Sequence, residues 1–300
     1  MLEEADALAA PPTESLTPQQ ARAASEIRLS DHWGEKGAVA SIEAFEISSG
    51  AARVRARLYR PGGAANTILF LHGGGWVVGS IDTHDGPVRA LARATGANVL
   101  SLEYRKAPEA PFPAGLDDAE AALNWLRAHA EAKGFASERL ILAGDSAGAT
   151  IAAVLAIRAR DRGIPLAGQV LIYPATDLAN STASREEFAE GYSLHASTME
   201  WFARHYLAGG TAPTDPGVSP ALAKDLSGLA PALLVTADHD PLRDEGRAYA
   251  QRLIAAGNDV CYEEWRGTVH GFFIMDRTTP AARELIARIG EWANSLWRRE

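Results

Sequence analysis

The serine with the clearest chemical use lies in the segment Gly144-Asp145-Ser146-Ala147-Gly148. An apolar run that predicts a strand precedes it, and an alanine-rich run that predicts a helix follows it. This is the setting of a G-x-S-x-G nucleophile elbow, where a sharp turn holds the serine in a strained conformation. The glycines leave room for that turn. We therefore expect Ser146 to be a nucleophile rather than part of an ordinary tight turn, with the Ala147 N–H facing developing negative charge.

A second informative segment, His72-Gly73-Gly74-Gly75-Trp76, follows another predicted strand. Its three glycines expose backbone N–H groups, and an acyl-transfer enzyme needs such donors where a carbonyl oxygen becomes an oxyanion. The spacing matches neither the G-x-G-x-x-G nor the G-x-x-x-x-G-K-[ST] pattern, which argues against a nucleotide site. The alternatives are a source of oxyanion donors and a flexible turn, and we favour the donors.

A serine at neutral pH needs a base and an orienting acid. Among the eight histidines, His270 follows the last predicted strand and has the right place in the chain order Ser, acid, His. The acid is expected after the penultimate strand, where Asp238 and Asp240 occur. Asp240 is favoured because it has left the strand, although either aspartate could cap the next helix. Asp238-His239-Asp240 has no partner His-x-x-x-His elsewhere, so no metal is expected.

Together these motifs resemble the hormone-sensitive lipase-like family of α/β-hydrolases, closest to the bacterial family IV esterases with a G-D-S-A-G elbow. The similarity covers nearly the whole chain in order, at residues 72–76, 104–109, 144–148, 240–246 and 270–272. It implies Ser146 as nucleophile, His270 as base and Asp240 as acid. It also implies an oxyanion hole formed by the N–H groups of Gly74, Gly75 and Ala147.

One segment departs from the pattern of this family. Glu103 and Lys106 stand where the family often has Asp and Leu, in a stretch of the form D-Y-R-L-A-P-E. We expect neither residue to touch the chemistry, and we expect Lys106 to change only the packing nearby.

The elements that must position these residues alternate along the chain. Five short runs are apolar on both faces, as strands of a helix-covered parallel sheet require: 67–71, 97–102, 139–143, 169–173 and 232–236. Helical stretches are expected at 87–94, 115–133, 147–162 and 242–256, and a last strand and helix at 259–265 and 281–297. Two segments with one polar face, 39–47 and 53–59, predict antiparallel edge strands. We predict an α/β-hydrolase fold: a mostly parallel sheet with antiparallel N-terminal strands and helices on both faces.

A stretch of nearly sixty residues between Tyr173 and Ala232 contains no strong strand signal. A loop that long in a compact domain is usually functional, for example a lid. The resemblance identifies about 1–36 and about 175–218 as the two parts of a helical cap on a single catalytic domain, 1–300. We expect substrate to contact the following aromatic residues, of which the last three could instead be cap core: Trp76, Tyr173, Trp201, Phe202 and Tyr206.

Composition excludes several classes of function. The 300 residues carry a net charge of −9, which argues against a nucleic-acid or anionic-membrane binder. The single cysteine, Cys261, excludes an internal disulfide and a thiolate zinc cluster. The start, Met1 to Asp6, is acidic, and no apolar run is long enough to span a membrane, so a cytoplasmic protein is expected. The strand at 259–265 could pair across a homodimer axis, or its glutamates could protect a free edge.

These observations predict a carboxylic ester hydrolase that uses a Ser-His-Asp triad, an acyl-enzyme and no cofactor. Its expected partner is a small-molecule ester, and bulky walls under a cap favour short-to-medium acyl chains. An amidase or arylformamidase-type hydrolase is the alternative within enzymes, because the same triad can cleave a C–N bond. A non-catalytic ligand receptor on the same fold is the alternative outside enzymes, and the presence of His270 argues against it.

Overall fold

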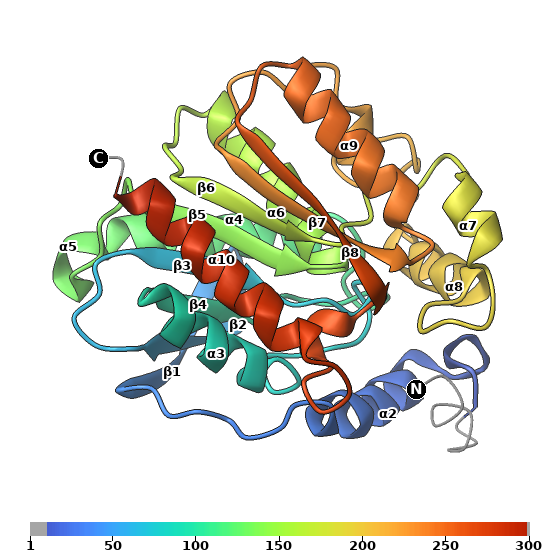
Figure 1. Ribbon diagram of the computed structural model, residues 1–300, viewed down its shortest axis with the longest axis horizontal. Coiled ribbons are helices and arrows are strands. Elements are labelled where there is room, and N and C mark those ends of the chain that lie inside the picture. The colour runs from blue at the N-terminus through green and yellow to red at the C-terminus, as the bar shows by residue number, and fades with distance from the viewer. Residues whose placement is uncertain (1–10, 299–300) are drawn as a thin grey trace.

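The computed structural model describes residues 11–298, which form an α/β structure around one sheet (Figure 1). In this part of the chain the sheet has eight strands in the order β1-β2-β4-β3-β5-β6-β7-β8. β1 pairs antiparallel with β2 and β2 with β4, and every other pair is parallel. The predicted fold class is confirmed. The strands are β1 Ser41–Ser49, β2 Ala52–Arg60, β3 Thr67–Leu71, β4 Asn98–Leu102, β5 Leu140–Asp145, β6 Gly168–Ile172, β7 Ala232–His239 and β8 Val260–Val269.

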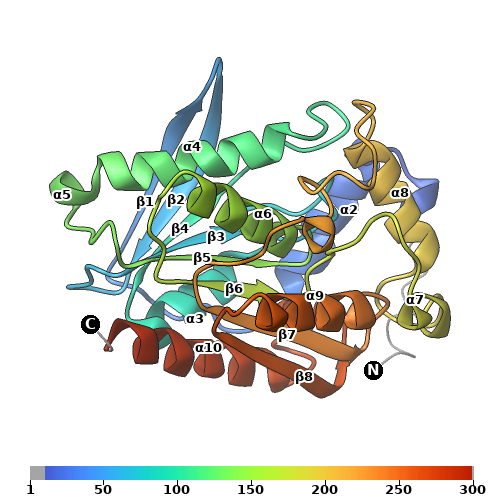
Figure 2. The same cartoon turned by 90° about the horizontal axis from the view of Figure 1, so that it is seen from above.

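Helices cover both faces of the sheet (Figure 2). α3 (Asp85–Thr95) and α10 (Ala281–Trp297) pack together on one face, with the alternate strand residues Ile68, Phe70 and Val99. α4 (Ala114–Ala128), α6 (Ala147–Asp161) and α9 (Arg243–Ala255) contribute to the core on the other face. Strands β3 to β6 are buried along their whole length because neither face meets water, which explains their uninterrupted apolar sequence.

Several expected boundaries differ from the structure, and two of the differences have a clear physical cause. The helix predicted over 115–133 is divided into α4 and α5 (Ala130–Lys133) at His129, whose ring stacks on Trp125 with centroids 4.5 Å apart. The last strand continues four residues beyond Trp265, to Val269. It does so because the Asp238 carboxylate on β7 accepts the N–H groups of Gly267 and Thr268, at 2.9 and 3.0 Å, beside an irregularity in the β7–β8 register.

Helices from the two segments expected to form a cap lie beyond the carboxyl ends of the parallel strands (Figure 1). They are α2 (Pro18–Asp31), α7 (Ala183–Glu187) and α8 (Ala196–Tyr206), with the short 3-10 turn η1 (Thr13–Ser15) before α2. The Glu14 carboxylate accepts the hydroxyls of Ser197 and Thr198 at 2.7 and 2.9 Å, which joins η1 to α8. The division of the chain into one catalytic domain and a cap stays a prediction. Residues 1–10 of the expected cap lie outside the part of the chain that the structure describes.

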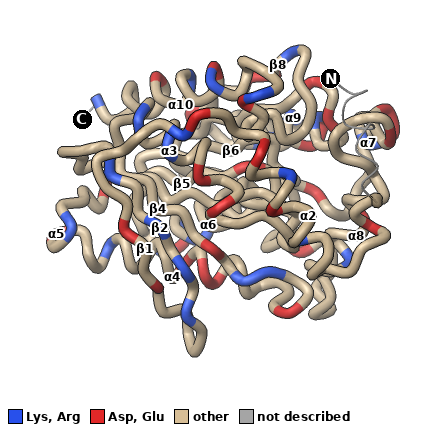
Figure 3. Tube along the Cα trace, turned by 90° about the horizontal axis from the view of Figure 1, so that it is seen from below, with Lys and Arg blue, Asp and Glu red and all other residues tan. Residues whose placement is uncertain are grey.

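The start of α2 is fixed by its local sequence. Thr17 and Gln20 form a capping box, and Pro18 occupies the first helical turn. Two further 3-10 turns, η2 (Pro220–Leu222) and η3 (Phe272–Ile274), connect the later elements. Basic and acidic residues are interspersed along the chain (Figure 3). Between residues 11 and 298, no helix combines the length and the apolar composition needed to cross a membrane.

Candidate active site

Ser146 lies at a strained turn between β5 and α6, with φ of 51° and ψ of −123°. The neighbouring glycines allow this turn to press against the end of β3. A Cβ on Gly144 or on Gly148 would lie less than 3.0 Å from the Leu71 carbonyl oxygen, closer than real side chains approach. The elbow is therefore specified by its own sequence, because a side chain at either glycine would push it away from β3.

The structure brings Ser146, His270 and Asp240 together at the carboxyl ends of three strands. The His270 Nε2 lies 2.9 Å from the Ser146 Oγ, and its Nδ1 lies 2.7 Å from the Asp240 Oδ2. The other Asp240 oxygen accepts the Leu242 N–H at 2.9 Å, so this fully buried carboxylate is fixed from two sides. Since an ionised carboxylate only accepts, the His270 Nδ1 carries a proton and Nε2 can accept the serine hydroxyl.

Asp238, the other candidate acid, has different partners. Besides the two amides of the Gly267–Thr268 turn, its carboxylate receives the Nδ1 of His239 at 2.9 Å. These bonds lower the pKa of Asp238 although partial burial opposes the shift. Asp238 thus holds the chain just before His270 without contacting that ring. No group of three His, Cys, Asp or Glu side chains in residues 11–298 is placed to hold a metal ion.

The glycine-rich segment after β3, which we call the oxyanion loop (residues 72–78), folds into a tight turn. The Gly74 carbonyl accepts the N–H groups of Val77 and Val78 at 3.0 and 2.8 Å. Gly74 and Gly75 have φ of 122° and 56°, which side chains rarely adopt. The Gly73 N–H donates to the Asp145 Oδ1 at 2.8 Å, which fixes the loop beside the elbow.

Asp145, the residue before the serine, is a buried anion whose partners the sequence alone does not identify. The Nε2 of His84 lies 3.2 Å from its Oδ1, and the Tyr173 hydroxyl donates to its Oδ2 at 3.5 Å. Burial opposes ionisation, but His84 and the Gly73 N–H outweigh it, so the pKa of Asp145 is lowered. A partner for Asp145 could have been expected from the sequence, because a carboxylate at the end of a buried strand needs one. The identity of that partner could not.

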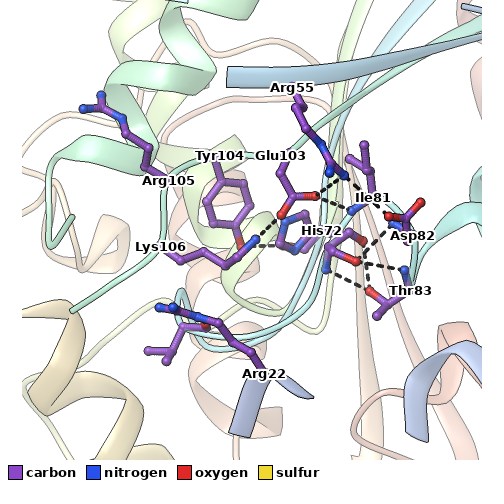
Figure 4. A network of polar contacts seen from close by, with 12 residues as sticks. Arg22, Arg55, His72, Ile81, Asp82, Thr83, Glu103, Tyr104, Arg105 and Lys106 are labelled. Atoms are coloured by element: carbon purple, nitrogen blue, oxygen red, sulfur yellow. Dashed lines mark hydrogen bonds and ion pairs between the residues drawn. The ribbon is translucent and has the colours of Figure 1, made fainter. Parts of the chain in front are cut away.

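The segment that follows β4 supports the oxyanion loop (Figure 4). The Tyr104 hydroxyl donates to the His72 carbonyl at 2.7 Å, and the Ala107 N–H donates to the Trp76 carbonyl at 2.9 Å. The Glu103 carboxylate accepts the Ile81 N–H at 2.9 Å and pairs with Lys106. The two residues that depart from the family pattern therefore compensate each other's charge.

The structure separates the five aromatic residues expected at the substrate site. Trp76, with φ of 61°, stacks on Tyr206 with centroids 4.2 Å apart. Trp201 is buried with Val77 and Val78 of the oxyanion loop. The half-buried Phe202 ring covers the Cα of Gly75 so closely that a Cβ there would lie under 3.0 Å from it.

Tyr173 takes a different position from the other four. It is only 1% exposed, and its ring lies 4.6 Å from that of His270. This contact suits a residue that orients the imidazole. Contact of these five aromatic residues with substrate stays a prediction.

Comparison with known proteins agrees with this geometry. The family model described as the alpha/beta hydrolase fold matches residues 68–274, more than half of the chain. The chain belongs to this family. The alpha/beta hydrolase is 43% identical over 237 residues to the carboxylic ester hydrolase LipN of Mycobacterium tuberculosis, a match that covers 76% of this chain and 63% of LipN. It is also 43% identical to the carboxylesterase NlhH of the same species, over 74% of this chain and 70% of NlhH.

Solved structures match over nearly the whole alpha/beta hydrolase. An ester hydrolase from the metagenome of Lake Arreo is 41% identical, with a TM-score of 0.95 over 99% of this chain and 96% of that one. The carboxylesterase EstE1, cloned from a metagenomic library, is 40% identical, with a TM-score of 0.90 over 94% of this chain and 98% of EstE1. The resemblance to hormone-sensitive lipase-like esterases is confirmed, and the chain is a carboxylic ester hydrolase.

Proposed function

We propose that this esterase cleaves short-to-medium acyl esters of small molecules through an acyl-enzyme formed on Ser146. His270 is the general base and acid, and Asp240 is the carboxylate that orients it. The observation that carries the proposal is the unbroken chain of two hydrogen bonds from the Ser146 hydroxyl through the His270 ring to the Asp240 carboxylate.

The reaction begins when the Ser146 Oγ attacks the ester carbonyl and its proton moves to the His270 Nε2. The imidazolium that forms is stabilised by Asp240, and it then donates this proton to the departing alcohol. Water takes the place of the alcohol, loses a proton to the same Nε2 and attacks the acyl-enzyme. Collapse of the second tetrahedral intermediate returns the proton to Ser146 and releases the carboxylic acid.

The oxyanion of each tetrahedral intermediate is held by backbone N–H groups of Gly74, Gly75 and Ala147. Ala147 opens α6, and the first amides of a helix have no carbonyl of the preceding turn to bind. The positive end of the helix dipole points toward the same place. Donors fixed in advance stabilise developing charge without having to reorganise during the reaction.

Preference for shorter acyl chains is supported by the aromatic groups beside the glycines. Trp76 stacks on Tyr206, and Phe112 packs against the same tyrosine. The Phe112 ring lies edge-on to the Tyr206 ring, with centroids 5.7 Å apart. Phe202 adds a fourth ring over Gly75. A relative from Pseudomonas putida that is 40% identical is named ethyl acetate hydrolase, after an ester with a two-carbon acyl group.

Hydrolysis rates of p-nitrophenyl acetate, butyrate, octanoate and palmitate test this proposal, with butyranilide as the matching amide. We expect the highest kcat/KM between acetate and octanoate, and slower cleavage of the anilide. A palmitate optimum would refute the chain-length preference, and faster cleavage of the anilide would refute ester specificity. Full activity of Ser146→Ala would refute the nucleophile.

A further inference from the structure

We propose that Arg22 on α2 is a positioning residue for the oxyanion donors and that it acts through the carbonyl of Val77. The proposal rests on the function proposed above, in which Gly74 and Gly75 supply two of those donors. Arg22 lies in a part of the chain for which the motifs of the sequence predict no chemistry.

The guanidinium of Arg22 binds two backbone carbonyls that belong to different segments. Its Nε donates to the Val77 oxygen at 2.8 Å, and its Nη2 donates to the Ala107 oxygen at 2.7 Å. The Glu109 carboxylate receives Nη1 and Nη2 at 3.0 and 2.5 Å, which orients the planar group. Figure 4 shows Arg22 reaching from its helix toward the segments that carry His72 and Lys106.

The Val77 carbonyl is a sensitive point because its own peptide closes the turn of the oxyanion loop. That peptide joins Val77 to Val78, and its N–H, which belongs to Val78, donates to the Gly74 carbonyl at 2.8 Å. A rotation of the Val77–Val78 peptide therefore moves the Gly74–Gly75 peptide, which carries the Gly75 N–H assigned to the oxyanion and adjoins the Gly74 N–H. Apolar packing of Val77 against Ala21 and Trp201 fixes where the residue lies, but such packing has no directional preference for the carbonyl.

Arg22 also connects the oxyanion loop to the segment after β4 that contains Ala107. Ala107, whose carbonyl it binds, donates its own N–H to Trp76 within the loop. Arg22 and Ala107 thus hold neighbouring carbonyls of the oxyanion loop, at residues 77 and 76. This gives a role to the end of the 104–109 segment, which the proposed chemistry leaves unassigned.

A positioning role and a structural role predict different measurements. An ion pair with a partner as exposed as Glu109, at 52%, contributes little to stability. Oxyanion donors, by contrast, act within a narrow range of distances, and a displacement of about 1 Å can cost on the order of 10²-fold in rate. Loss of Arg22 should accordingly reduce kcat far more than it reduces the thermal unfolding midpoint.

The experiment compares Arg22→Met, Arg22→Lys and the control Arg28→Met, which removes the same charge from the same helix at an exposed position. Readouts are kcat and KM for p-nitrophenyl butyrate, the Ki of a trifluoromethyl ketone that forms an oxyanion adduct with the serine, and the unfolding midpoint. We expect Arg22→Met to lower kcat by about 10- to 100-fold, with KM within about threefold. The Ki should rise by the factor lost in kcat/KM, Arg22→Lys should fall between, and Arg28→Met should match the wild type.

Unchanged kcat and Ki in Arg22→Met would overturn the proposal, as would a rise in KM alone. If Arg22→Met fails to fold, Glu109→Gln provides the test, because it weakens the orientation of Arg22 and should lower kcat in the same direction by a smaller factor. Phosphonate labelling of wild-type Ser146 distinguishes a failure of the proposed function from a failure of the proposed role of Arg22. Absence of labelling would refute the proposed function, whereas normal labelling with unchanged kcat in Arg22→Met would refute only the role of Arg22.

Discussion

The nucleophile elbow and the oxyanion loop lie side by side but are held in place by different means. The elbow is specified by residues within it, since Gly144 and Gly148 permit its contact with β3 and Ser146 carries the strain. The oxyanion loop is held from outside. Its carbonyl and N–H groups bind Asp145, Tyr104, Ala107 and Arg22, which come from the strand–helix turn, the segment after β4 and α2.

This difference has a chemical reason. A nucleophile must be exposed at one point, and a rigid strand–turn–helix unit achieves this with local sequence. Backbone donors must instead be left free toward the substrate, so their segment needs anchors on its other side. We therefore expect changes in the elbow and its triad to abolish the reaction, and changes in the anchors to reduce it by degrees.

The largest effect should come from Ser146→Ala. Removal of the nucleophile should lower kcat by roughly 10⁶-fold, because members of a triad act as a unit. Circular dichroism should stay at the wild-type spectrum, since the helix and strand around the turn remain. A purified variant with residual activity well above this level would show that another group attacks the ester.

Asp240→Asn should have the next largest effect, a loss in kcat of about 10⁴-fold, because an amide cannot hold the required tautomer of His270. Asp238→Asn is the matched control two positions away. It weakens the bonds to the Gly267–Thr268 turn and to His239, neither of which involves the His270 ring, and we expect it to keep most of the activity. Steady-state kinetics of the two variants test whether Asp240 is the acid of the triad. A larger loss of kcat in Asp238→Asn than in Asp240→Asn would contradict this assignment.

Gly75→Ala tests the oxyanion loop itself. An alanine must adopt φ of 56° and displace the Phe202 ring, so we expect kcat to fall by about 10²-fold, the loss typical of one misplaced donor. The double variant Gly75→Ala/Phe202→Ala removes the clash and should recover part of this loss. If Phe202→Ala gives no recovery, the ring does not press on the loop as the structure places it.

Glu245→Gln should have the smallest effect, on stability rather than rate, because Glu245 belongs to neither region. Burial raises its pKa to about 7, against the opposing effects of Arg185 and the Thr176 N–H. A raised pKa means that the folded state binds the extra proton, so this contribution to stability is full below about pH 4.5 and is lost as the pH rises through 7.

Urea unfolding of wild type and Glu245→Gln at pH 5 and pH 8 measures this contribution. The wild type should lose up to about 3 kcal/mol relative to the variant between these two values. Values of kcat for the two proteins should agree. An equal difference in stability at both pH values would contradict the titration of Glu245.

The convergence of Ser146, Asp240 and His270 could be predicted from the sequence, because these residues, unlike the anchor Arg22 of the oxyanion loop, lie at the ends of strands. Ser146, Asp240 and His270 each follow a strand of recognisable apolar sequence, and parallel strands end at one edge of a sheet. Their convergence could therefore be inferred without any knowledge of side-chain contacts.

The anchors of the oxyanion loop could not be inferred in this way. Arg22 and Val77 are 55 positions apart, and their contact depends on where α2 packs beyond the carboxyl ends of the strands. The pair of Asp145 and His84 likewise joins an elbow residue to the start of α3. Such contacts follow from tertiary packing and leave no periodic pattern in the chain.

The most direct test of the central claim is peptide mapping by mass spectrometry after reaction with a p-nitrophenyl phosphonate. We predict one adduct per chain, on Ser146, formed with loss of esterase activity in the same proportion, and much slower labelling of His270→Ala. A fully inactivated enzyme with its adduct on another residue, or a fully labelled Ser146 with undiminished activity, would contradict the account.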